Sequence, residues 1–161
     1  IMAGYFGIGI YPNKCKRNIG TLWRSAQLFQ ASYVFTIQMK YKWQPSDTLK
    51  SWRKVPFFHH VEITDFISSL PKDSVLVGVE LTEDAADIVD FKHPKRAVYL
   101  LGAEDSGLPE EILGQCKMVI KLPGKYSMNV STAGSLVMYD RYIKTVRKDC
   151  FMNDRLRRIL S

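Results

Sequence analysis

The chain has 161 residues, of which 46% are hydrophobic and 24% charged. This length and balance describe one globular domain with a substantial core, and they exclude a disordered chain. No apolar run approaches the ~20 residues of a membrane span, and the first ten residues lack the basic region of a signal peptide. The chain contains 23 Lys and Arg residues and 16 Asp and Glu residues, which gives a net charge of +7. This charge favours an anionic partner such as nucleic acid.

The first predicted elements alternate between strand and helix. Residues 5–11 are apolar and aromatic and end before a proline, which predicts a buried strand. Asn18 is placed to cap a helix that carries an apolar stripe to about Gln30. A second strand is predicted over residues 33–37, which are rich in aromatic and β-branched side chains.

The middle of the chain begins with a long polar stretch. Residues 40–54 are basic and aromatic and predict a loop that carries a short helix from Ser46. Periodicity then predicts, in order, a strand over 55–61, a helix over 63–70, a strand over 75–81, a small helix over 83–91 and a strand over 97–102.

The last predicted elements are a strand, a tight loop and a long helix. An apolar run through Ile120 and Leu122 predicts a strand that Pro123-Gly124 ends. Small polar side chains follow, and apolar residues at helical spacing then predict a helix over 130–147. The tail over 154–158 predicts a basic helical end.

This order of elements predicts an α/β fold with a mostly parallel sheet covered by helices on both faces. We expect a single domain over residues 1–161, without a separate RNA-binding domain. Three polar segments, around 18–26, 100–109 and 120–135, each follow a predicted strand. Because ligands in open α/β sheets bind beyond the carboxyl ends of the strands, we expect the three segments to form one site.

The cysteines and histidines give no sign of a metal site or a disulfide framework. Cys15, Cys116 and Cys150 are far apart and match no CxxC pattern, and His59 and His60 have no partner at metal-ligand spacing. We therefore expect structural thiols, no metal, no membrane association and a reducing, cytoplasmic location.

In this order, the three segments resemble the motifs of the SpoU/TrmH family of SPOUT-class RNA methyltransferases. Asn18 and Arg24 match the first motif, and Ser127-Met-Asn129-Val-Ser131 matches the third. Gly102-Ala-Glu104, with Gly107-Leu-Pro109, matches the second. The resemblance runs from Tyr5 to about Tyr142, although the loop between Leu122 and Ser127 is more compact than in many relatives.

The resemblance implies a C-terminal trefoil knot that forms a pocket for S-adenosylmethionine. It further implies methyl transfer to a ribose 2′-hydroxyl of RNA, with tRNA as the first candidate substrate and rRNA as the second. It also implies a homodimer, for which the first and last helices offer Leu22, Phe29, Tyr139 and Tyr142. A knotted RNA-binding protein without catalytic activity stays open as an alternative, as does a non-RNA α/β enzyme.

The site residues expected from the resemblance fall into three groups. The catalytic group is Arg24, Asn18, Glu104, Ser127 and Asn129. The cofactor-binding group is Leu101, Gly102, Glu104, Gly107, Ile120, Leu122, Ser127, Met128 and Asn129. The RNA-binding group is Lys14, Lys16, Arg17 and Arg24.

Each group also has a purely structural interpretation. Arg24 is also in keeping with an exposed position on an amphipathic helix, and Asn18 with a helix cap. Glu104 is in keeping with an ordinary loop carboxylate, and Ser127 and Asn129 with capping of the long helix. The apolar cofactor-binding positions are in keeping with simple core.

Overall fold

The computed structural model describes residues 4–12, 17–38 and 51–145. The strands are β1 (Tyr5–Ile10), β2 (Tyr33–Ile37), β3 (Phe57–His60), β4 (Val75–Val79), β5 (Ala86–Asp87), β6 (Arg96–Leu101) and β7 (Met118–Lys121). The helices are α1 (Arg17–Leu28), η1 (Ser51–Arg53, a 3-10 turn), α2 (Ile63–Ser69), α3 (Glu110–Leu113) and α4 (Val130–Thr145). None of the helices in these ranges is long and apolar enough to cross a membrane.

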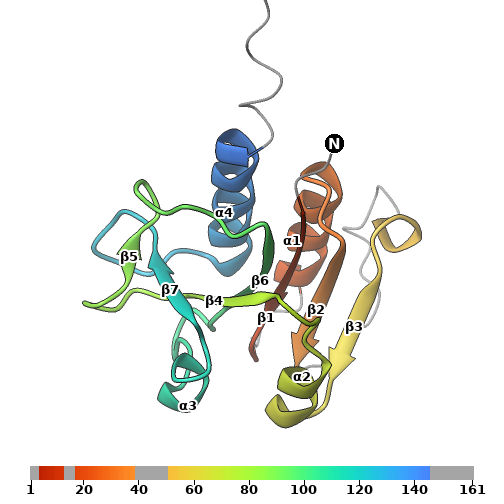
Figure 1. Ribbon diagram of the computed structural model, residues 1–161, viewed down its shortest axis with the longest axis horizontal. Coiled ribbons are helices and arrows are strands. Elements are labelled where there is room, and N and C mark those ends of the chain that lie inside the picture. Colours follow the sequence, from red (N-terminus) through yellow and green to blue (C-terminus); the bar gives the residue numbers. More distant parts are fainter. Residues whose placement is uncertain (1–3, 13–16, 39–50, 146–161) are drawn as a thin grey trace, which may run out of the picture.

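The seven strands form one sheet in the order β3-β2-β1-β6-β4-β7-β5. Every pairing between these strands is parallel. Parallel neighbours need crossover connections, and the helices and loops between the strands supply them. The predicted α/β fold with a parallel sheet is therefore confirmed (Figure 1).

Helices cover both faces of this sheet. Along β6, Tyr99 and Leu101 pack in the core cluster that α1 and α4 share, whereas Val98 and Leu100 pack with residues of α2 and α3. This alternation is the two-residue period of a strand that is buried on both faces. In Figure 1, α1 and α4 accordingly lie side by side, apart from α2 and α3.

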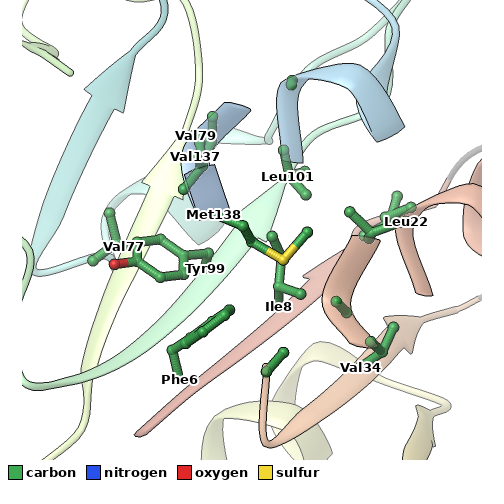
Figure 2. Close-up of a cluster of buried hydrophobic side chains, with 14 of the residues drawn as sticks. Phe6, Ile8, Leu22, Val34, Val77, Val79, Tyr99, Leu101, Val137 and Met138 are labelled. Atoms are coloured by element: carbon green, nitrogen blue, oxygen red, sulfur yellow. The ribbon is translucent and has the colours of Figure 1, made fainter. Parts of the chain in front are cut away.

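Close packing of α1 against α4 depends on Gly134. Figure 2 shows Leu22 of α1 pointing into the same core as Val137 and Met138 of α4. A Cβ atom added at Gly134 would lie 2.3 Å from Cδ1 of Leu22 and 3.2 Å from Cδ1 of Leu101. Leu22 is fully buried there. It therefore does not contribute to a dimer surface, and that part of the sequence prediction is wrong.

Replacing Gly134 with leucine is expected to lower the free energy of unfolding by about 1–3 kcal/mol, because the added atoms overpack a filled core. Urea denaturation of the two proteins measures the difference. Gly114 is the matched control, since it has a φ of −63° and its Cβ would meet only ordinary contacts at 3.4 Å and beyond. A Gly134→Leu protein as stable as Gly114→Leu would contradict this account.

The helix predicted over residues 83–91 does not form, and that prediction is wrong. Ala86 and Asp87 instead make the short strand β5, which pairs with β7. The ammonium of Lys144 donates hydrogen bonds to the carbonyls of Val89 and Phe91, at 2.8 and 3.2 Å, and also to Ile88. Contacts with distant segments therefore satisfy backbone groups that a helix would have paired locally.

Two other predicted helical segments lie outside the described residues. These are residues 40–50 of the 40–54 loop and the basic tail over 154–158; of the rest of that loop, Ser51–Arg53 forms the turn η1. Cys15 and Cys150 also lie outside. Cys116 is a free thiol whose pKa is raised to about 11 by burial, with a smaller opposing effect from the backbone of Gly78.

A polar network joins α4 to the segment before β6. Arg141 donates from Nη1 to the Tyr99 hydroxyl at 3.1 Å, and burial raises the pKa of Tyr99 to about 12. The hydroxyl therefore keeps its proton and donates it to Nδ1 of His93, 2.7 Å away. Nε2 of His93 then carries the ring proton and donates to Asp140 at 2.8 Å. This arrangement holds His93 in its neutral form.

The stability of the protein is expected to fall as the pH drops below 6.5, in part because of His93. Burial lowers the pKa of His93 below its ordinary value of 6.5, Asp140 opposes this, and Arg141 and Lys144 lower the pKa further. Below pH 6.5 the unfolded chain gains a proton that the folded chain does not bind, so acid favours unfolding. Thermal unfolding between pH 7.5 and 5.5 should show a smaller loss of stability for His93→Gln than for the wild type.

The control for this measurement is His60→Gln. The pKa of His60 is also lowered, by partial burial first and by His59 second, with Asp65 opposing. His60 takes no part in the network on α4, so its replacement should leave the contribution of His93 in place. An unchanged pH dependence in His93→Gln would show that His93 does not resist protonation.

Candidate functional site

The three polar segments meet through one hydrogen-bonded cluster. Oε1 of Glu104 accepts from Nδ2 of Asn18 at 3.2 Å and from Nδ2 of Asn129 at 2.7 Å. Nδ2 of Asn129 also donates to Oδ1 of Asn18 at 2.9 Å. In the sequence, Glu104 lies 86 positions and Asn129 lies 111 positions after Asn18. The predicted convergence of the three segments is therefore observed.

Asn129 has two roles within the cluster. Its Oδ1 accepts hydrogen bonds from the backbone of Ser131 at 3.1 Å and Thr132 at 3.3 Å, which makes it the cap of α4. The backbone N–H of Val130 donates to Glu104 at 3.1 Å, so this carboxylate lies at the positive end of the helix. The structural interpretation of Asn129 as a cap is therefore confirmed, and the residue also takes part in the cluster with Asn18 and Glu104.

Asn18 is not the cap of its helix, and that prediction is wrong. Helix α1 already includes Arg17, and Asn18 lies in its first turn with only 6% of its surface exposed. A buried amide needs hydrogen-bonding partners, and Glu104 and Asn129 supply them. The side chain of Asn18 is therefore turned toward the site.

Sequence reasoning missed Glu80, which shapes the second segment. Its carboxylate accepts from the backbone N–H of Leu108 at 2.7 Å and of Leu81 at 3.0 Å. A Cβ at Gly102 or Gly107 would lie 2.7 or 2.6 Å from Oε2 of Glu80, and Gly107 has a φ of +63°. The signal available in the sequence was a carboxylate directly after the apolar strand, beside a glycine-containing loop.

A pocket opens beside this cluster, at the carboxyl ends of β4, β6 and β7. This is the edge of an α/β sheet where ligands are expected. The residues that line it are Val79, Glu80, Leu81, Leu101, Gly102, Ala103, Glu104, Leu122, Tyr126, Ser127, Met128, Val130 and Ala133.

The structure brings together only part of the predicted site. The predicted cofactor-binding residues that line the pocket are Leu101, Gly102, Glu104, Leu122, Ser127 and Met128. Gly107, Ile120 and Asn129 are not part of this lining: Gly107 leaves room for Glu80, Asn129 donates to Glu104, and Ile120 is fully buried in β7. Ser127 is therefore the only predicted catalytic residue besides Glu104 that lines the pocket directly.

Of the predicted RNA-binding residues, the structure describes the side chain of Arg24, which lies apart from the pocket lining. Arg24 is exposed on α1, about 9 Å along the helix axis from Asn18 at 1.5 Å per residue. It is not part of the pocket lining. Arg17 begins α1, and Lys14 and Lys16 lie outside the described residues.

The pocket combines apolar walls with negative charge. Leu101, Leu122 and Met128 supply the apolar surface, and the carboxylates of Glu80 and Glu104 lie on the lining. Such a lining suits a ligand with a flat apolar part and a positive charge. S-adenosylmethionine has an adenine ring and a sulfonium, so the residues present fit it. Within the described ranges no group of His, Cys, Asp and Glu could hold a metal ion.

Comparison with known families gives a match over most of the chain. Residues 8–139 match the family described as the SpoU rRNA methylase family. The matched range contains Asn18, Glu104 and Asn129, together with all of the residues that line the pocket.

Two curated proteins are similar in sequence. The chain is 30% identical over 99 residues to the “Putative tRNA (cytidine(34)-2′-O)-methyltransferase” of Lactococcus lactis subsp. cremoris (strain MG1363), covering 57% of this chain and 59% of that protein. It is 20% identical over 132 residues to tRNA (guanosine(18)-2′-O)-methyltransferase TARBP1 of Mus musculus, covering 76% of this chain and 8% of that protein. The chain therefore spans less than two thirds of the length of either relative.

A solved structure shares the fold. The SpoU methyltransferase AviRb from Streptomyces viridochromogenes, in complex with the cofactor AdoMet, superposes with a TM-score of 0.78 at 20% identity. The superposition covers 89% of this chain and 61% of that one.

Proposed function

This chain belongs to the SpoU rRNA methylase family, and on that basis we propose that it transfers a methyl group from S-adenosylmethionine to a ribose 2′-hydroxyl of RNA. The observation that carries the proposal is the hydrogen-bonded cluster of Asn18, Glu104 and Asn129 beside the pocket. One residue from each of the three motif segments takes part in it. This cluster is not expected in an unrelated α/β enzyme, in which the three segments would have no common role.

S-adenosylmethionine supplies an activated methyl group, so the protein has to position the acceptor hydroxyl and help it lose its proton. Leu101, Leu122 and Met128 would hold the apolar part of the cofactor. Glu104 and Asn129 would fix the loops around it. Arg24 would stabilise the charge that develops on the 2′-oxygen, since a guanidinium stays protonated and serves poorly as a base.

The proposed substrate is tRNA, with rRNA as the second candidate. Both relatives described above are named for methylation of tRNA. The net charge of +7 supports a polyanionic substrate of either kind. A reducing, cytoplasmic location is proposed alongside, in keeping with the free thiol of Cys116.

The proposed fold around the pocket is the trefoil knot implied by the resemblance. Support comes from the segments after β4, β6 and β7, which all line one pocket with the start of α4. A crystal structure traced through residues 75–145 would test the knot, and a chain path that passes through no loop would rule it out.

The proposed homodimer rests on an apolar surface of α1 and α4, formed by Leu28, Phe29, Leu136, Tyr139 and Tyr142. The ring of Phe29 lies 6.3 Å from that of Tyr139 and 6.1 Å from that of Tyr142, and Tyr139 is 51% exposed. Leu28, which precedes Phe29 in the chain, is 72% exposed. A contiguous exposed surface of this composition is typical of an interface.

Replacing Tyr139 with glutamate is expected to convert the dimer into a monomer, because it places a charge in the centre of this apolar surface. Sedimentation equilibrium measures the mass. The control is Val89→Glu, since Val89 is 66% exposed and outside the α1–α4 surface. A wild-type protein that sediments as a monomer would contradict the proposed dimer.

The proposed function is tested first by calorimetric titration with S-adenosylmethionine and S-adenosylhomocysteine. We expect micromolar binding, on the order of −8 kcal/mol. Incubation with bulk tRNA and with ribosomal RNA, followed by nucleoside analysis for 2′-O-methylation, then identifies the substrate. Binding of RNA without binding of either cofactor would favour the alternative of an RNA-binding protein without catalytic activity.

A further inference from the structure

The rim of the pocket carries an aromatic side chain that the function described so far does not use. Tyr126 lines the pocket and is 87% exposed, the most exposed of the large apolar side chains in the described part of the chain. A tyrosine buries almost none of its surface at this exposure, so it contributes little to folding. Its position at the mouth of a pocket calls for a partner from outside the protein.

The loop after β4 also contributes to the pocket lining and is held in place by hydrogen bonds. Leu81 also lines the pocket and is 42% exposed, and its backbone N–H donates to Glu80 at 3.0 Å. The ammonium of Lys121 donates to the carbonyls of Thr82 at 3.5 Å and Glu83 at 3.3 Å. These contacts fix the loop after β4, so that the partly exposed, apolar Leu81 is an anchored part of the pocket lining, to which Tyr126 also belongs.

The loop that carries Tyr126 has the composition of a nucleic-acid contact. Gly124 has a φ of +137°, which turns the chain after Pro123, and Lys125 and Tyr126 follow, both exposed. Ser127, the next residue, also lines the pocket. Aromatic side chains bind unpaired bases by stacking, and a neighbouring lysine binds phosphate.

We propose that Tyr126 stacks on an unpaired nucleobase of the RNA substrate and so brings the acceptor ribose to the pocket, with Lys125 binding the adjacent phosphate. The inference rests on the proposed function. Because Tyr126 is 87% exposed, its ring surface is available to a macromolecule outside the pocket. Tyr126 is thus a positioning residue for RNA and not part of the cofactor site.

The test compares Tyr126→Phe, Tyr126→Leu and Tyr126→Ala with the wild type. The RNA dissociation constant is measured by fluorescence anisotropy with end-labelled bulk tRNA in the presence of S-adenosylhomocysteine, and the cofactor dissociation constant by calorimetry. Tyr126→Phe keeps the aromatic ring and is expected to bind RNA within about twofold of wild type. Leucine and alanine lose the stacking surface and are expected to weaken RNA binding on the order of 5- to 100-fold, with the cofactor constant unchanged.

The salt dependence separates stacking from charge. Lys125→Ala is expected to reduce the slope of log Kd against log salt by about one, whereas the Tyr126 variants should leave the slope unchanged. Lys72→Ala is the matched control, because Lys72 is exposed in the turn before β4, at the opposite end of that strand from the pocket.

Three results would overturn the inference. Equal RNA binding by Tyr126→Leu and Tyr126→Phe would show that ring stacking is not used. Parallel weakening of the cofactor constant would make Tyr126 a cover for the cofactor. Absence of binding to both tRNA and the cofactor by the wild-type protein would contradict the proposed function itself. This outcome is distinguishable, because the wild type is measured before any variant is compared.

Discussion

Replacing Arg24 with alanine is expected to lower the rate of RNA methylation by about 10²–10³-fold, with the affinity for S-adenosylmethionine nearly unchanged. Arg24 is exposed on α1 and absent from the pocket lining, so its loss removes no cofactor contact among the described residues. Its guanidinium is available to the RNA, where it would stabilise the developing negative charge on the 2′-oxygen. Loss of one such donor typically costs about 2.7–4 kcal/mol of transition-state stabilisation.

Single-turnover methylation and cofactor calorimetry, run on the same preparations, measure the two quantities separately. Arg96→Ala is the matched control, because Arg96 is exposed at the start of β6 and pairs with Asp73 at 3.4 Å. Exposed ion pairs of this kind contribute little to stability. Equal loss of methylation and cofactor binding in Arg24→Ala would rule out the role assigned to Arg24.

Replacing Glu104 with alanine is expected to abolish methylation and also to weaken cofactor binding, in contrast to Arg24→Ala. The carboxylate accepts hydrogen bonds from Asn18, Asn129 and the backbone of Val130, so its loss releases all three motif segments together. We expect the free energy of unfolding to fall by only about 1 kcal/mol, since Glu104 is largely exposed and water replaces part of these contacts.

Urea denaturation, calorimetry and methylation assays on Glu104→Ala and Glu104→Gln check this expectation. Glutamine keeps one oxygen that can accept hydrogen bonds but loses the charge at the start of α4, so it should fall between alanine and the wild type. Glu111→Ala is the control, as Glu111 is an exposed carboxylate of α3 outside the pocket. Full activity in Glu104→Ala would show that the cluster merely caps α4.

The sequence was sufficient where local pattern decides structure. Strands such as β1 and β6 are apolar runs bounded by turn residues, and α4 has a continuous helical period, so their boundaries follow from residue spacing. Asn18, Glu104 and Asn129 could be named through the resemblance of their segments to the motifs of the SpoU/TrmH family, and each of these segments follows a predicted strand. Parallel strands of an α/β sheet direct such segments to one edge, which is why a common site could be expected.

Tertiary structure decided what depends on residues far apart in the chain. Residues 83–91 carry a helical pattern, yet pairing of β5 with β7 and the contacts of Lys144 satisfy their backbone differently. Leu22 lies on an apolar stripe that the sequence cannot orient, and only the packing of α1 against Gly134 shows that it is buried. Glu80 acts through the backbone of Leu108, a partner that no local spacing indicates. The sequence by itself thus determined the elements and the polar residues between them, whereas packing and long-range hydrogen bonds decided which of those residues line the pocket, because both depend on how distant segments meet.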